Sequence, residues 1–222
     1  LPLTVCCCVF ALVCLRYRHM CIRHRIQVCY AQQPSSPPAG PAGTLSDEMA
    51  RRLLAEGHQV TMVCGSYHGG QTGLQGAFRR GRREGQVDGI QVVEFNLAYS
   101  NADGFLKRAG LFLLFALRSV LVALTRRYDV VFATSTPLTA GIPGIVARWL
   151  RGKRFVFEVR DLWPELPKAM GVITNPPVLW LLSCLEWPTH PSSLRLVAPS
   201  PSTAPGLLTT GRDPTPTPAT LP

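Results

Sequence analysis

The stretch at residues 158–165, which reads E-V-R-D-L-W-P-E, holds the most distinctive set of reactive side chains in the chain. Apolar residues precede it without interruption, so a buried strand is expected to deliver Glu158, Arg160 and Asp161 to the carboxyl edge of a sheet. An arginine and an aspartate beside a tryptophan suit a clamp for a sugar or a phosphate, because a guanidinium donates paired hydrogen bonds to oxyanions. The alternative is a structural ion pair between Arg160 and Asp161 that only fixes the loop.

Polar residues also follow two other apolar runs. His68 comes after residues 59–64, and Ser135 with Thr136 comes after residues 129–134. Hydroxyls and backbone N–H groups at such positions can face a ligand. Equally, His68 can be an ordinary loop histidine, and Ser135 with Thr136 can be a helix cap. No His, Cys and Asp residues have the spacing of metal ligands, so we expect no bound metal.

The elements that position these residues alternate between strands and helices. Apolar runs predict strands at residues 26–30, 59–64, 90–95, 129–134 and 155–159. Helices are predicted from Thr44 to Gly57 and at residues 105–127, 138–151 and 177–187. Residues 65–88 hold seven glycines and four arginines and are predicted to form a long loop. This order predicts an α/β fold with a Rossmann-like parallel sheet and helices on both faces, whose ligands bind at the carboxyl ends of the strands.

Several nucleotide-binding and hydrolase motifs are missing from the sequence. After the first predicted strand the glycines are Gly40 and Gly43, which do not form a G-x-G-x-x-G pattern. The sequence also lacks a P-loop and a G-x-S-x-G elbow, which argues against a P-loop NTPase and an α/β-hydrolase.

The segment at residues 158–165 resembles the N-terminal domain of bacterial family 4 glycosyltransferases of the GT-B fold, of the type that builds O-antigen, capsule or exopolysaccharide. Residues 48–65, 88–93 and 128–138 resemble the same domain in the same order. The resemblance covers residues 25–187, and residues 195–213 are a weaker match to the last strand and helix of that domain. It implies the N-terminal half of a GT-B fold.

The resemblance also implies an activity. The family transfers a sugar from a nucleotide-sugar donor, the co-substrate, to a lipid-linked acceptor of the undecaprenyl type or to a saccharide, with no other cofactor. From their places at the ends of the predicted strands, we predict that the acceptor is bound by Gly40, Gly43, His68, Ser135, Thr136, Glu158, Arg160 and Asp161. The catalytic and donor-binding residues, including an E-x7-E pair, belong to a second half that we expect beyond this chain. Alone, this chain is therefore expected to be a poor catalyst, and its own E-x7-E string, Glu48 to Glu56, is interpreted as chance.

A long apolar helix with basic ends is predicted at residues 105–127. Its basic residues are Lys107, Arg108, Arg118, Arg126 and Arg127. One interpretation is an interfacial helix on anionic lipid, which predicts a cytoplasmic protein attached peripherally to the inner face of the cell membrane. The other is a core helix packed on the sheet.

The chain has 222 residues and a net charge of +10, which suits one domain. Residues 31–187 carry 17 basic and 12 acidic residues, which is too mild an excess for a nucleic-acid-binding arm. Residues 1–24 form an apolar and basic extension, interpreted as an artefact, a membrane anchor or a folded element. Residues 188–222 include nine prolines and are expected to be poorly ordered. These two ends favour a damaged gene product. The basic apolar helix and the expected lack of a donor half favour an alternative function, a non-catalytic membrane-associated or interaction module from an incomplete gene.

Overall fold

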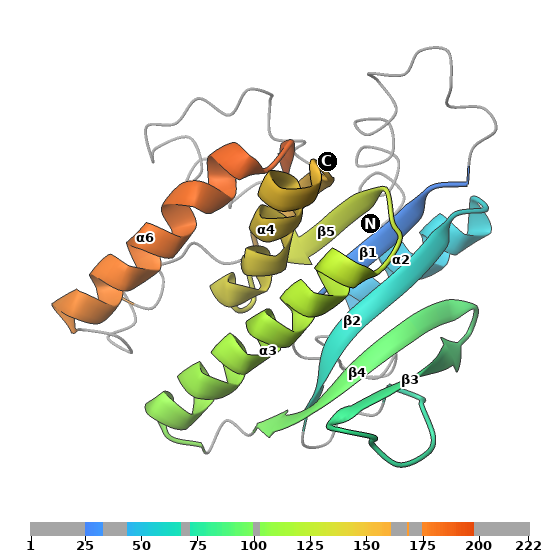
Figure 1. The fold of residues 1–222 in the computed structure, drawn as a ribbon, viewed down its shortest axis with the longest axis horizontal. Helices are drawn as coiled ribbons and strands as arrows, with labels where there is room; N and C mark the ends of the chain where they lie inside the picture. The colour runs from blue at the N-terminus through green and yellow to red at the C-terminus, as the bar shows by residue number, and fades with distance from the viewer. Residues whose placement is uncertain are drawn as a thin grey trace.

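The computed structural model describes residues 25–32, 44–67, 72–99, 103–160, 168 and 175–197. These residues form a seven-stranded sheet with helices on both faces (Figure 1). The strands are β1 (Gln27–Ala31), β2 (Gln59–Tyr67), β3 (Arg82–Val87), β4 (Ile90–Tyr99), β5 (Val130–Thr134), β6 (Arg154–Glu158) and β7 (Arg195–Val197). Their order across the sheet is β3-β4-β2-β1-β5-β6-β7. All neighbouring strands are parallel except β3, which pairs antiparallel with β4.

The helices divide between the two faces of this sheet. They are α2 (Thr44–Ala55), α3 (Phe105–Thr125), the short 3-10 helix η1 (Leu138–Gly141), α4 (Ile142–Arg151) and α6 (Pro176–Ser192). Successive side chains of a strand point to opposite faces, so Tyr30 packs with α2 whereas its neighbours Cys29 and Ala31 pack with α3 and α4. Figure 1 shows α3, α4 and α6 together on one side of the sheet, with α4 between the other two. The predicted Rossmann-like α/β fold is confirmed.

The glycine-rich segment at residues 65–88 differs from the prediction of a long loop. It contains the end of β2 and the whole of β3, which forms a hairpin with β4. Asp88 and Gly89 make the turn with φ angles of 48° and 86°. Two left-handed residues in a row, of the Asp-Gly type, are the favoured two-residue turn between antiparallel strands. The turn therefore overrides the low strand propensity of this segment.

The end of the described chain also extends past the predicted elements. The helix predicted at residues 177–187 is α6, and it continues to Ser192. After it, β7 pairs with β6 in parallel, at the position where the sequence showed a weak match to the last strand of the domain. The expected boundary at residue 188 thus falls inside a helix that packs on the sheet.

Candidate functional site

The centre of the sheet contains the point where the strand order reverses. From β1 the chain passes to β2 on one side, and after β4 it crosses to β5 on the other side of β1. In open α/β sheets the crevice outside the carboxyl ends of two such strands is the usual ligand site. The residues at this place are therefore the first candidates for function. They come from the ends of β1, β5 and β6 and from the start of α2.

A buried carboxylate and an arginine lie at the end of β6. The Glu158 side chain is 2% exposed, and Arg160 contacts its Oε2 through Nε at 3.1 Å and Nη2 at 3.0 Å. A buried carboxylate requires such a partner, because its desolvation is costly. Burial is the largest single influence and acts to lower the pKa of Arg160, but Glu158 and Tyr30 together outweigh it, so the net pKa is raised. The guanidinium is therefore charged and held in one orientation.

Two hydroxyl groups complete the polar contacts of this pair. The Tyr30 hydroxyl lies within donating distance of Ser46 Oγ (3.0 Å) and Glu158 Oε2 (3.3 Å). Arg160 Nη2 donates to Ser46 Oγ at 2.6 Å. Burial first, and the Glu158 carboxylate second, raise the pKa of Tyr30 above its ordinary value. The phenol therefore stays protonated at neutral pH and remains a hydrogen-bond donor.

Ser135 joins the end of β5 to the same group. Its Oγ accepts a hydrogen bond of 2.8 Å from the Arg160 backbone N–H, and its own N–H donates to the Glu158 carbonyl at 2.8 Å. We call Tyr30, Ser46, Ser135, Glu158 and Arg160 the Arg160 cluster. It ties three neighbouring strands and α2 together at the carboxyl edge of the sheet.

The structure brings together only part of the residues predicted from the sequence. Glu158, Arg160 and Ser135 meet in the cluster, and Thr136 follows as a half-buried residue between β5 and η1. Among the described residues, the ion-pair partner of Arg160 is Glu158, two positions before it in the chain. The other predicted residues, Gly40, Gly43, His68 and Asp161, lie outside the described residues.

Sequence reasoning missed Tyr30 and Ser46. Each carried a signal that could have been used. Tyr30 is a phenol in an otherwise apolar strand, and it is fully buried and stacked on Phe132 with ring centroids 4.8 Å apart. Ser46 lies in the first turn of α2, and it is buried as well. A buried hydroxyl in either place needs a hydrogen-bond partner.

The chemistry available at the cluster is recognition of polar or anionic groups. The Arg160 side chain is 21% exposed, so part of the guanidinium reaches the surface while the rest is held by buried partners. Such a group suits a phosphate oxygen or a sugar hydroxyl. Among the described residues, no cluster of His, Cys, Asp and Glu could hold a metal ion.

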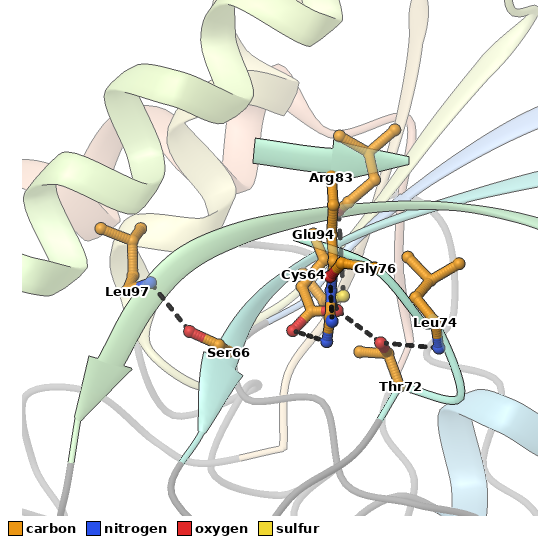
Figure 2. A network of polar contacts seen from close by, with 9 residues as sticks. Cys64, Ser66, Thr72, Leu74, Gly76, Arg83, Glu94 and Leu97 are labelled. Atoms are coloured by element: carbon orange, nitrogen blue, oxygen red, sulfur yellow. Dashed lines mark hydrogen bonds and ion pairs between the residues drawn. The ribbon is translucent and has the colours of Figure 1, made fainter. Parts of the chain in front are cut away.

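A second buried carboxylate, Glu94, lies on β4, away from the strand-order reversal. Arg83 of β3 donates two hydrogen bonds to this carboxylate, from Nε to Oε2 at 2.8 Å and from Nη2 to Oε1 at 3.1 Å. Thr72 donates to the same carboxylate, and Arg83 Nη1 donates to the Gly76 carbonyl at 3.2 Å. Figure 2 shows the Arg83 and Thr72 contacts meeting at Glu94. They fasten the segment before β3 to the sheet, so we assign this network a structural role.

The basic residues predicted to face a membrane have different surroundings. Arg118 donates to the Gly81 carbonyl at 3.2 Å and lies over the Phe95 ring, so it is directed toward the β3–β4 hairpin and we leave it out of any lipid contact. Arg108 lies over the Phe112 ring. The other three are exposed: Lys107 pairs with Asp103, Arg126 pairs with Glu84, and Arg127 follows it at the end of α3.

The helix α3 is apolar enough and long enough to cross a membrane, judged by length and composition. Only 28% of this apolar stretch is buried in the protein. One side of the helix packs on the sheet through Phe115, Ala116 and Val122, and the other side is exposed. The inner side of α3 therefore packs as the core-helix interpretation predicts, and the interfacial interpretation stays a prediction.

Comparison with known proteins identifies the class of protein that this fold and site define. Residues 40–218 match the model of the glycosyl transferase 4-like domain family. The chain belongs to this family, and the sequence-based assignment to a family 4 glycosyltransferase of the GT-B type is confirmed at that level. The narrower O-antigen, capsule or exopolysaccharide type stays a prediction.

A comparison with curated proteins found no match. Among solved structures, the chain is similar to α,α-trehalose 6-phosphate synthase from Burkholderia multivorans, with 12% identity and a TM-score of 0.47. The similarity covers 84% of this chain and 42% of that protein. The chain thus spans less than half the length of this relative.

Proposed function

We propose that this chain is the acceptor-side domain of a glycosyltransferase that moves a sugar from a nucleotide-sugar donor to a lipid-linked or polysaccharide acceptor. Membership of the glycosyl transferase 4-like domain family supports sugar transfer in general. The observation that carries the proposal is the Arg160 cluster at the strand-order reversal, because it presents a fixed cation where ligands of such sheets bind.

The proposed role of Arg160 is to position the acceptor. Its guanidinium donates to a hydroxyl or phosphate of the acceptor, while Glu158, Ser46 and Tyr30 fix its orientation. Holding a reactant in place contributes to the rate because the entropy of orientation is lost on binding and not in the transition state. The groups that bind the nucleotide and stabilise its phosphates are proposed to lie in the donor-binding half.

If the acceptor is linked to a lipid, the sugar is transferred at a membrane surface. We propose a cytoplasmic protein that is attached peripherally to the inner face of the cell membrane. The exposed basic residues at the ends of α3, Lys107 with Arg126 and Arg127, support attraction to anionic lipid. The exposed apolar side of α3 also favours the second candidate, a non-catalytic membrane-associated module.

The test is transfer of radiolabelled sugar from a panel of nucleotide sugars into extracted lipid and polysaccharide, catalysed by the gene product that contains residues 1–222. Arg160→Ala is expected to lower kcat/KM at least tenfold, which is about 1.4 kcal/mol of lost transition-state stabilisation. The control is Arg154→Ala, because Arg154 lies at the opposite, amino end of the same strand.

Arg160→Ala leaves Glu158 buried without its cation and can unfold the protein. A paired variant, Arg160→Met with Glu158→Leu, removes both charges together, and thermal unfolding is measured for each protein. A folded paired variant with wild-type transfer contradicts the role of Arg160. A wild-type protein that transfers no sugar from any donor contradicts the proposed function and favours the non-catalytic module.

A further inference from the structure

We propose that the outer side of α3, α4 and α6 forms one docking surface for an anionic lipid bilayer, and that Trp180 and Trp187 of α6 anchor it at the interface. The proposal rests on the membrane location given under the proposed function and extends it to α4 and α6. The proposal predicts that the protein contacts the membrane surface through the outer sides of all three helices.

The exposed large hydrophobic residues of the described chain all lie on these three helices. They are Leu106, Leu113, Leu114, Leu117 and Leu121 on α3, Trp149 and Leu150 on α4, and Trp180, Leu181 and Trp187 on α6. We call these ten residues the apolar helical face. The described residues of α2, which covers the other face of the sheet, include none of this kind. Such one-sided exposure marks an interaction surface, because single exposed apolar residues are normally scattered.

The outer side of α6 has the composition of a bilayer interface. Trp180, Cys184 and Trp187 recur at helical spacing, so they lie on one side of the helix, and all three are exposed. The described helix contains no Lys or Arg, and its one acidic residue is Glu186. Tryptophan is enriched at the boundary between lipid headgroups and acyl chains because its ring is apolar and its N–H is polar.

The charge of α3 and α4 complements an anionic surface. Apart from Arg118, which is directed toward the β3–β4 hairpin, these two helices carry Lys107, Arg108, Arg148 and Arg151, and they have no acidic residue. Arg126 and Arg127 follow directly after α3, and Arg127 and Arg148 are exposed. A mixture of exposed leucine and tryptophan with a basic surround favours anionic lipid as the occupant. A second protein copy would require like charges to meet across the interface.

The packing of α3 determines how the surface meets the membrane. The helix has 21 residues, about 30 Å at 1.5 Å per residue, which would span a bilayer core. However, Phe115, Ser119 and Val122 on its inner side are buried against the protein. The folded domain can therefore immerse only the outer side, so we infer that α3 lies in the plane of the interface.

The direction of these helices connects the surface to the Arg160 cluster. The strands β4 and β6 are parallel to β1, so their carboxyl ends lie at the edge that holds the cluster. Along the chain, α3 lies between β4 and β5, and α6 lies between β6 and β7. Each returns the chain to a parallel strand, so the first turns of α3 and α6 lie toward the same edge. A lipid-linked acceptor in the membrane would then present its head group toward Arg160.

The test uses phosphatidylcholine vesicles with and without phosphatidylglycerol. We expect the protein to co-sediment with the anionic vesicles, and brominated lipids to quench its tryptophan fluorescence. We also expect these vesicles to slow alkylation of Cys184 by a large maleimide, read at the level of the Cys184 peptide by mass spectrometry. Cys184 is exposed in the structure between the two anchoring tryptophans, so its protection reports contact by α6 itself.

Substitutions separate the two parts of the surface. Trp180→Gln with Trp187→Gln is expected to lower vesicle affinity at least tenfold, whereas Ala55→Gln on the exposed side of α2 leaves it unchanged. Arg126→Gln with Arg127→Gln is expected to weaken binding to anionic vesicles. Its matched control is Arg51→Gln with Arg52→Gln on α2, a pair of adjacent arginines that also form surface ion pairs.

Each of two results would overturn the proposal. One is vesicle affinity that the tryptophan substitutions leave unchanged in a protein whose thermal unfolding is also unchanged. The other is concentration-dependent protection of Cys184 without vesicles, which would assign the surface to a second copy of the chain. Vesicle binding requires no donor sugar, so the folded paired variant, Arg160→Met with Glu158→Leu, should retain it. Whether that variant transfers sugar then tests the proposed function alone, and its vesicle binding tests the docking surface alone.

Discussion

Glu158 and Arg160 show how a buried charge can be retained at a ligand-binding edge. The Glu158 carboxylate is nearly inaccessible, and the partially exposed Arg160 neutralises it. Tyr30 and Ser46 supply the remaining polar contacts, so the pair is satisfied without water at those atoms. An arginine held in this way loses little conformational entropy when it binds a ligand, and this makes it suitable for positioning.

Tyr30→Phe is the first prediction at this scale. The substitution removes the hydroxyl beside Glu158 and Ser46 but keeps the ring that stacks on Phe132. Loss of a buried hydrogen bond should lower the free energy of unfolding by about 1–2 kcal/mol, measured by urea unfolding. Because Arg160 loses a neighbour that orients it, we also expect a several-fold higher KM for the acceptor.

Tyr128→Phe is the matched control for this prediction. Tyr128 is also buried, and its hydroxyl donates to the Ala123 carbonyl, away from the Arg160 cluster. We expect a comparable loss of stability with no change in KM. If both variants changed KM equally, the effect of Tyr30→Phe would be one of general stability, and its role in positioning Arg160 would be refuted.

Among the elements, the hairpin of β3 and β4 depends most on particular side chains. The Asp88-Gly89 turn reverses the chain, and Glu94 binds Arg83 and Thr72 beneath the segment that leads into β3 (Figure 2). Among the described strands β3 pairs with β4 alone. The contacts of Glu94 therefore attach β3 to the sheet by side chains as well as by backbone hydrogen bonds. The hairpin is therefore expected to be stable only while Glu94 keeps its cation.

Arg83→Ala and Arg82→Ala make a matched pair on β3. Arg83 neutralises the buried Glu94, whereas Arg82 pairs with Glu84 near the surface. Removing Arg83 should lower the free energy of unfolding by about 3 kcal/mol, because it leaves a buried charge without a partner. Removing Arg82 should cost less than about 1 kcal/mol. Equal losses in a denaturant titration of the two variants would contradict the assigned role of the Glu94 network.

The elements also show what the sequence could and could not predict. Strands β1, β2, β4, β5 and β6 are rich in apolar residues and alternate with predicted helices, so their existence and their parallel arrangement could be predicted. Strand β3 was missed because its sequence, R-R-E-G-Q-V, has few apolar residues, although the Asp-Gly pair that follows is a known hairpin signal.

Within the site, the prediction reached only the side chains directly after strands. Ser135 follows β5, Glu158 ends β6 and Arg160 comes two residues after it, so their common edge follows from the parallel sheet. Their contact with Tyr30 depends on β1 lying beside β5, and their contact with Ser46 depends on how α2 packs. Such contacts join residues more than one hundred positions apart, and no local pattern predicts them.

At the scale of the whole molecule, the fold fixes where the Arg160 cluster and the apolar helical face lie relative to each other. The Arg160 cluster lies at the carboxyl edge of the sheet, and the apolar helical face lies on the side covered by α3, α4 and α6. In the proposed arrangement, the apolar helical face binds lipid and the Arg160 cluster faces the head group of the acceptor. The domain would then bind an acceptor because it lies in the membrane and because its head group fits the cluster.

The most direct test of the central claim is to map where the acceptor binds. A polyprenyl diphosphate sugar with a photoreactive group on its first sugar is cross-linked to the protein in anionic vesicles, and the labelled peptides are sequenced. We predict labels at the carboxyl ends of β1, β5 and β6, around Tyr30, Ser135 and Arg160, and much weaker labelling in Arg160→Lys. Labelling confined to α2 or to the β3–β4 hairpin would contradict the proposal that this edge of the sheet binds the acceptor.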